Sequence, residues 1–284
     1  MPSLGSAPPI GYPGAVDIRA VKFRVDGGWR VGGLYSPSRA GSFPAVLCLH
    51  GFPGVQKNED IAAELCRRGM VCLMPYFRGC WGSDGRYTVS GMLEDVKAAH
   101  RLLSDYPHVD DARVGVFGVS LGGWAALRLA SERPLAAAAV LAPAVDLQPG
   151  PEAIEYTCRN GKVLKVAEPR SLVGDYAAAM RKAPPPDFMP RISPCPLLLV
   201  QGLKDRMVPA ASTRRLWRLA QEPKELVELA DEEHEFQNNR AGLVKLVCGW
   251  LQRRLLIGGT ELAFQAAGSR PSTLSSRLHT AKGW

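Results

Sequence analysis

The sequence predicts an α/β protein with a mostly parallel sheet and helices on both of its faces. Uninterrupted apolar segments of strand length recur from Pro44 onward, and amphipathic stretches of helical length separate them. Solid apolar strands that alternate with such helices are typical of a parallel sheet covered on both sides. At 284 residues, with 46% hydrophobic and 22% charged residues, the chain can bury one large core or two small ones.

The first expected elements form a β-hairpin. Val21–Val25 and Arg30–Tyr35 have strand-like patterns around the turn formers Asp26-Gly27-Gly28. Residues 1–14 are rich in Pro, Gly and Ser, and we expect a flexible lead-in there.

Strands and helices are then expected to alternate up to about Leu256. The expected strands have the sequences PAVLCLHG, MVCLMPYF, VGVFGVS, LAAAAVLAP, PLLLVQG and ELVELA. The expected helices cover residues 59–68, 92–106, 121–132, 210–221 and 240–256. This pattern assigns residues 15–146 and 191–257 to one core.

Residues 147–190 interrupt the alternation. This part of the chain has no strand pattern, three consecutive prolines at 184–186 and scattered aromatic residues. A structureless loop of this length is uncommon inside a compact domain, so we expect an inserted cap with short elements of its own. Residues 258–284 lose all periodicity, and we expect a loosely ordered tail.

Charge and hydropathy disfavour several classes of partner. The 35 Lys and Arg exceed the 27 Asp and Glu by 8, but no run of five basic residues occurs, so we expect no nucleic-acid partner. The longest apolar run, Leu135–Val145, has about eleven residues and is too short to span a bilayer. The N-terminus lacks the pattern of a signal peptide. We therefore expect a cytoplasmic protein, monomeric or homodimeric, that acts on a small molecule.

The seven cysteines are scattered and contain no Cys-x-x-Cys pair. Cys48 and Cys72 lie inside apolar runs, where a buried thiol is the ordinary interpretation. We expect a reducing compartment, no disulfide framework, and neither a metal nor a cofactor.

The segment Gly118-Val119-Ser120-Leu121-Gly122-Gly123 lies between an expected strand and an expected helix. A serine at such a sharp turn projects above the sheet edge, and Gly118 and Gly122 let the neighbouring chain pass close by. The alternative is a Gly-rich phosphate or dinucleotide turn. Neither Gly-x-Gly-x-x-Gly nor a following Gly-Lys-Ser/Thr is present, so Ser120 is the expected nucleophile.

A serine hydroxyl needs a histidine base, and that base needs a carboxylate to orient it. His234 follows the last expected strand and precedes the last helix, which places it at the same sheet edge as Ser120. The other histidines are expected in the oxyanion segment, a helix, a loop and the tail: His50, His100, His108 and His279.

Asp205 is the expected acid because it follows the strand PLLLVQG, at the same edge. Asp146, after the preceding strand, and Asp175, within the insertion, are the alternatives. The nearby glutamates are expected to be solvated: Glu232, Glu233 and Glu235.

An oxyanion hole requires two backbone N–H donors. The N–H of Leu121, directly after the nucleophile, is one candidate. The other is the N–H of Phe52, in the segment His50-Gly51-Phe52-Pro53-Gly54 that turns toward Ser120.

From about Pro44 to Leu256 the chain resembles the α/β-hydrolases. The segments that carry the resemblance are LCLHGFPG, YFRGCWGSDGR, GVFGVSLGG, QGLKDRMVP and DEEHEF, together with the order Ser120, Asp205, His234. More narrowly, the chain is similar to bacterial cinnamoyl and feruloyl esterases, to dienelactone-hydrolase-like proteins and to the catalytic domain of acylaminoacyl peptidases. Val119 departs from the His or Tyr often found at its position.

The resemblance implies a serine esterase whose cap lies over the acyl site, with Tyr156, Tyr176 and Phe188 lining it. The expected substrates are carboxylic esters, including aromatic esters of the feruloyl or cinnamoyl type. One alternative is a peptidase of the acylaminoacyl type; about 43 residues precede Pro44, which is far fewer than the propeller of such enzymes needs. The other is a hydrolase scaffold that binds without catalysis, which the presence of all three triad residues disfavours.

Overall fold

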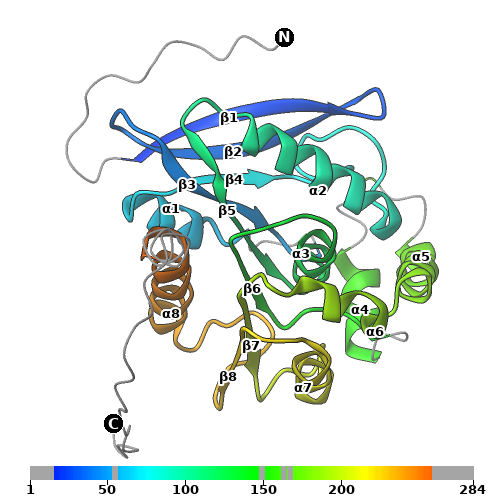
Figure 1. Ribbon diagram of the computed structural model, residues 1–284. Coiled ribbons are helices and arrows are strands. Elements are labelled where there is room, and N and C mark those ends of the chain that lie inside the picture. Colours follow the sequence, from blue (N-terminus) through cyan, green and yellow to red (C-terminus); the bar gives the residue numbers. More distant parts are fainter. Residues whose placement is uncertain (1–15, 53–56, 147–150, 161–164, 166–168, 258–284) are drawn as a thin grey trace, which may run out of the picture.

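The computed structural model describes residues 16–52, 57–146, 151–160, 165 and 169–257. An eight-stranded sheet with the order β1-β2-β4-β3-β5-β6-β7-β8 forms its centre (Figure 1). β2 runs antiparallel to both of its neighbours, and all other neighbouring strands are parallel. The predicted fold class is confirmed.

The expected lead-in (1–14) and tail (258–284) lie outside the described residues. The strands are β1 (Val16–Val25), β2 (Gly28–Pro37), β3 (Phe43–Leu49), β4 (Val71–Pro75), β5 (Val109–Val119), β6 (Ala137–Leu141), β7 (Leu197–Gly202) and β8 (Lys224–Leu229).

The expected hairpin is present and longer than its sequence pattern indicated. Val25 pairs with Gly28 across a two-residue turn in which Asp26 (φ 51°) and Gly27 (φ 78°) both have positive φ. Turns of this kind match the twist of antiparallel strands, so the pairing continues as far as Val16 and Pro37.

Helices cover both faces of the sheet. α1 and α8 pack on one face, and α2, α3 and α7 pack on the other. Neighbouring residues of β3 show this division, since Val46 belongs to the first layer and Leu47 to the second. The helices are α1 (Glu59–Arg67), α2 (Val89–Ser104), α3 (Leu121–Glu132), α4 (Pro151–Asn160), α5 (Pro169–Lys182), α6 (Pro185–Phe188), η2 (Met189–Ile192), α7 (Ala210–Leu219), α8 (Arg240–Gln252) and η3 (Arg253–Ile257).

α2 begins three residues earlier than the sequence pattern predicted. Thr88 caps it, because its side-chain oxygen accepts a hydrogen bond from Gly91 N at 3.2 Å. Such a cap satisfies one of the free N–H groups of the first turn and fixes where the helix starts.

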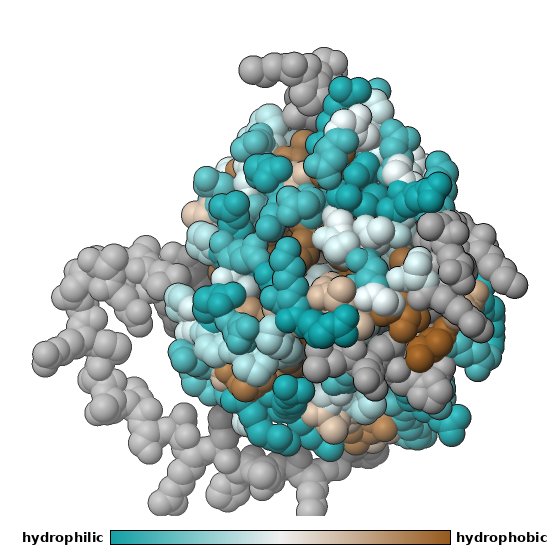
Figure 2. Space-filling view, turned by 90° about the vertical axis from the view of Figure 1, so that its right-hand side faces the viewer, coloured by the Kyte–Doolittle hydropathy of each residue, from teal (hydrophilic) through white to brown (hydrophobic). Residues whose placement is uncertain are grey.

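The chain between β6 and β7 supplies α4, α5, α6 and η2 (Figure 1). α4 packs against α5, and α5 packs against α2. Asp175 of α5 accepts hydrogen bonds from the backbone N–H groups of Val89 and Ser90, at the start of α2. Asp175, one of the two alternatives for the catalytic acid, therefore links the insertion to the core through these hydrogen bonds. Figure 2 looks onto this side, which is mostly hydrophilic with small hydrophobic areas.

Within the described residues, no helix combines the length and apolar character needed to cross a membrane. The same residues contain no cluster of His, Cys, Asp and Glu arranged to hold a metal ion. All seven cysteines are free thiols, and all but Cys158 are buried.

Candidate active site

Ser120 lies at the turn between β5 and α3 with φ 54° and ψ −119°. This backbone conformation is costly for a residue with a side chain and requires support from its surroundings. Ser120 N donates a hydrogen bond to Leu141 O at 2.9 Å, and Ser120 O accepts one from Ala144 N at 3.0 Å. The neighbouring strand β6 and the chain that follows it thus hold the turn in place.

Gly118 and Gly122 are required because neighbouring backbone atoms lie very close to them. A Cβ on Gly118 would lie 2.3 Å from Gly122 O, and a Cβ on Gly122 would lie 2.3 Å from both Leu49 O and His50 O. Neither position therefore has room for a side chain. The turn is pressed against the end of β3, as the sequence predicted for Gly118 and Gly122.

His234 and Asp205 form a hydrogen-bonded pair. His234 Nδ1 lies 2.8 Å from Asp205 Oδ2, and Asp205 Oδ1 accepts hydrogen bonds from Met207 N and Val208 N, both at 2.8 Å. The two backbone donors fix the carboxylate, which in turn orients the imidazole with Nδ1 as donor and Nε2 as acceptor. That tautomer is the one a general base needs.

Ser120 is placed at the same edge as this pair, because β5, β7 and β8 are parallel and end there. Its hydroxyl makes no hydrogen bond to His234 among the described residues. Such contacts are often long without substrate and shorten in the Michaelis complex. The structure therefore shows the contact between Asp205 and His234. The contact between His234 and Ser120 stays a prediction.

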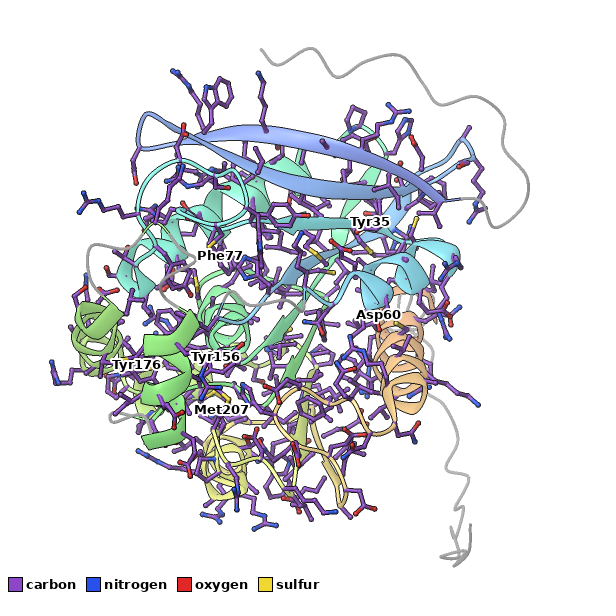
Figure 3. All side chains as sticks on the ribbon, turned by 180° about the vertical axis from the view of Figure 1, so that it is seen from behind. Tyr35, Asp60, Phe77, Tyr156, Tyr176 and Met207 are labelled. Carbon is purple, nitrogen blue, oxygen red and sulfur yellow. The ribbon has the colours of Figure 1, made fainter. Side chains whose placement is uncertain are left out.

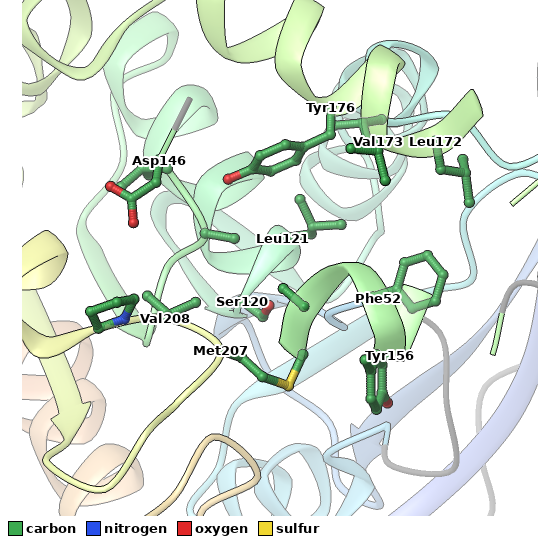
Figure 4. Close-up of a pocket in the computed structure, with 15 residues that line it drawn as sticks. Phe52, Ser120, Leu121, Asp146, Tyr156, Leu172, Val173, Tyr176, Met207 and Val208 are labelled. Carbon is green, nitrogen blue, oxygen red and sulfur yellow. The ribbon is translucent and has the colours of Figure 1, made fainter. Parts of the chain in front are cut away.

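Phe52, Ser120 and Leu121 line one cavity of about 210 Å³ (Figure 4). Leu121 is the first residue of α3, so its N–H has no partner within that helix. A Cβ on Gly51, next to Phe52, would lie 3.2 Å from Ser120 Cβ. The two segments expected to supply the oxyanion donors therefore meet at the nucleophile.

Most of the cavity wall is apolar, and the insertion contributes a large part of it. Tyr156 of α4 and Tyr176 of α5, both labelled in Figure 3, line the cavity (Figure 4). The ring of Tyr156 contacts that of Phe52, with 6.0 Å between the ring centroids. The apolar and aromatic lining consists of Phe52, Val89, Leu121, Ala144, Val145, Ala153, Tyr156, Leu172, Val173, Tyr176, Met207, Val208 and Pro209.

The structure places Phe188, the third expected lining residue, elsewhere. Its side chain is fully buried in the core, beneath the guanidinium of Arg128 at 5.4 Å from the ring centroid. Phe188 does not line the cavity, because α6 directs it against α3 rather than toward Ser120.

Asp146 and the Tyr176 hydroxyl form a polar end of the cavity that the sequence did not predict. Asp146 accepts a hydrogen bond from Ser212 Oγ at 2.5 Å, and Figure 4 shows the Tyr176 hydroxyl directed toward it. Burial raises the pKa of the Tyr176 phenol, as does the nearby Asp146 carboxylate. The sequence singled out both residues, but nothing in it placed them together.

Comparisons with known proteins agree with the fold described above. The model of the prolyl oligopeptidase family matches residues 61–256. An uncharacterized protein of Mycobacterium tuberculosis is 33% identical over 230 residues, which cover 80% of this chain and 73% of that one. The crystal structure of 2,6-dihydroxy-pseudo-oxynicotine hydrolase is similar, with a TM-score of 0.71, 24% identity and coverage of 85% of this chain and 69% of that one. Est1E from Butyrivibrio proteoclasticus with ferulic acid bound has a TM-score of 0.65, 21% identity and coverage of 87% and 100%. At these identities the two structures show a shared fold.

Proposed function

Since the chain belongs to the prolyl oligopeptidase family and is thus a serine hydrolase with the α/β-hydrolase fold, we propose that it hydrolyses carboxylic esters. The observation that carries the proposal is the 2.8 Å hydrogen bond between His234 Nδ1 and Asp205 Oδ2, at the sheet edge where Ser120 is held in a strained turn. An oriented base at the same sheet edge as a serine in a strand-to-helix turn is the arrangement that activates a hydroxyl.

In the proposed reaction, Ser120 Oγ attacks the ester carbonyl while His234 Nε2 takes its proton. The N–H groups of Phe52 and Leu121 stabilise the oxyanion of the tetrahedral intermediate. This intermediate collapses to the acyl-enzyme, and His234 returns the proton to the departing alcohol. His234 then deprotonates a water molecule that releases the acid, while Asp205 stabilises the imidazolium. Each oxyanion donor contributes on the order of 10²–10³ in rate.

The acyl group is proposed to occupy the cavity beside Ser120. Its apolar wall suits an aromatic body, and the Asp146 carboxylate can accept a hydrogen bond from a hydroxyl at the far end of that body. An ester of a hydroxycinnamic acid combines these features. Residues 147–190 act as a cap in this proposal, because α4 and α5 supply Tyr156 and Tyr176 to the wall.

A peptidase that acts on acylated or free N-termini is the second candidate, and it would use the same three catalytic residues. The carboxylate of Asp146 inside an apolar cavity favours it for substrates with a free amino group, because an ammonium would also bind there.

Turnover of three substrate types by the full chain tests the proposal: methyl ferulate, a short p-nitrophenyl ester and an aminoacyl p-nitroanilide. We expect kcat/KM for the esters to exceed that for the anilide, and Ser120→Ala to abolish turnover without loss of fold. A faster anilide reaction would establish the peptidase. If a fluorophosphonate adds no mass to the wild type, the serine is not activated and the chain is a binding protein.

A further inference from the structure

His50 has a buried imidazole that takes no part in the proton transfer described above. It follows the end of β3 and is 1% exposed. The ring of Phe77 lies against it, with centroids 4.2 Å apart, and the ring of Trp81 meets it edge-on at 4.7 Å. Two aromatic rings therefore hold the imidazole in one orientation.

The hydrogen bonds of His50 define its tautomer. Phe77 N lies 3.3 Å from Nε2, and a backbone N–H can only donate, so Nε2 is the acceptor. The ring hydrogen is then on Nδ1, which lies 2.8 Å from Gly51 O and donates to it. Burial lowers the pKa of His50 to about 3, with Lys57 acting in the same direction, so the ring stays neutral at physiological pH.

Gly51 C=O and Phe52 N–H belong to one peptide unit. In a trans peptide these two groups point in opposite directions, so a carbonyl directed at the imidazole sends the N–H away from it. The unit lies beside the nucleophile, since a Cβ on Gly51 would be 3.2 Å from Ser120 Cβ. Phe52 and Ser120 line the same cavity.

We propose that His50 is a positioning residue for the oxyanion hole: Nδ1–H holds the Gly51 carbonyl and thereby directs Phe52 N–H at the developing oxyanion. This inference rests on the ester hydrolysis proposed above. A hydrogen bond to a carbonyl also polarises its peptide unit, which makes Phe52 N–H a stronger donor. His50 thus acts on the transition state through the backbone without touching the substrate.

Three substitutions of His50 separate this role from a packing role. In His50→Asn the amide nitrogen lies close to the position of Nδ1 and can still donate to Gly51 O. In His50→Gln the amide reaches the position of Nε2 instead, and in His50→Leu no donor remains. Each variant is assayed with a p-nitrophenyl ester, and with a trifluoromethyl ketone that forms a tetrahedral adduct with Ser120.

We expect kcat to fall by about 10² in His50→Leu and His50→Gln with KM nearly unchanged, which is the effect of losing one oxyanion donor. The Ki of the trifluoromethyl ketone should rise by the same factor, whereas the Ki of an unreactive amide analogue of the ester, whose carbonyl stays planar and uncharged, should stay nearly constant. His50→Asn should keep most of the activity. A packing role would not produce this order or the difference between the two inhibitors.

Equal kcat values for His50→Asn and His50→Gln would overturn the inference, as would a rise in KM with unchanged kcat. Thermal unfolding checks whether His50→Leu folds. If it does not, the kcat values of His50→Asn and His50→Gln decide whether the inference holds. Two separate measurements test the underlying function: labelling of the wild type by the fluorophosphonate, and the turnover of Ser120→Ala. An unlabelled wild type would refute the proposed function, whereas a labelled wild type with fully active His50 variants would refute the positioning role alone.

Discussion

Asp205 and Asp146 follow neighbouring parallel strands, β7 and β6, yet they have different surroundings. Asp205 is buried and its carboxylate binds two backbone N–H groups and the imidazole of His234. Asp146 lines the cavity and binds the hydroxyl of Ser212. The difference shows that a position after a strand brings a carboxylate to the edge but does not decide what it faces.

Local backbone geometry makes the difference. The chain after Asp205 turns back at once, so Met207 N and Val208 N bind the same carboxylate oxygen. Gly202, at the end of β7, lets the loop that carries His234 come close, because a Cβ there would lie 2.4 Å from Glu232 O. The Asp146 carboxylate lines the cavity instead and is held there by the hydroxyl of Ser212, in α7.

The largest effect is expected for Asp205→Asn. An amide cannot hold the tautomer that His234 needs, so kcat should fall by about 10⁴ for every ester, as it does in other serine triads. Steady-state kinetics with two unrelated esters measure this, and circular dichroism checks the fold. Asp146→Asn is the matched control. If that control lost kcat on both esters while Asp205→Asn did not, the roles of the two aspartates would have to be exchanged.

His50 and His234 extend the comparison, because of these two histidines only His234 has a carboxylate partner. Burial and Lys57 hold the pKa of His50 near 3, below the ordinary 6.5, so the unfolded chain binds a proton at His50 in a pH range where the folded chain does not. The stabilisation from the neutral imidazole is therefore complete above pH 6.5 and is lost as the pH falls from 6.5 toward 3.

Urea unfolding at several pH values measures this effect against His50→Asn, which has no group that titrates there. We expect the free energy of unfolding of the wild type to fall by a few kcal/mol more than that of the variant between pH 7 and pH 4. Parallel curves for the two proteins would mean that His50 takes up its proton without cost to the fold.

A smaller and selective effect is expected at the polar end of the cavity. Tyr176→Phe and Asp146→Asn should each raise KM for a hydroxycinnamoyl ester by about five- to tenfold, since one hydrogen bond contributes about 1–1.4 kcal/mol. The matched cinnamoyl ester, which lacks the hydroxyl, should keep its KM. Equal changes for both esters would show that Asp146 shapes the cavity without binding the hydroxyl.

The smallest effect is expected for Ser212→Ala. This change removes the 2.5 Å hydrogen bond that holds the Asp146 carboxylate but leaves the carboxylate itself. KM for the hydroxycinnamoyl ester should rise only a few-fold, as expected for a bond that acts through another group. A loss larger than that of Asp146→Asn would indicate a direct contact between Ser212 and the substrate.

Hydrophobic patterning predicted the sheet and its helices, because strands buried on both faces must be apolar throughout and their helices amphipathic. It did not predict how far β1 and β2 extend or where α2 begins, since the turn at Asp26-Gly27 and the cap at Thr88 decide these. The expectation for Phe188 failed because aromatic character does not distinguish a core side chain from a cavity wall. Tyr156 and Tyr176 line the cavity as expected.

The sequence by itself determined the fold class, the glycines that permit the sharp turn at Ser120, and the edge at which Ser120, Asp205 and His234 lie. These features follow from the spacing and size of residues close together in the chain. Only the tertiary structure decided that Asp205 rather than Asp146 binds His234, that Tyr176 faces Asp146, and that His50 holds the Gly51 carbonyl. Each of these contacts depends on the angle at which the backbone leaves a strand, and local residue patterns do not specify that angle.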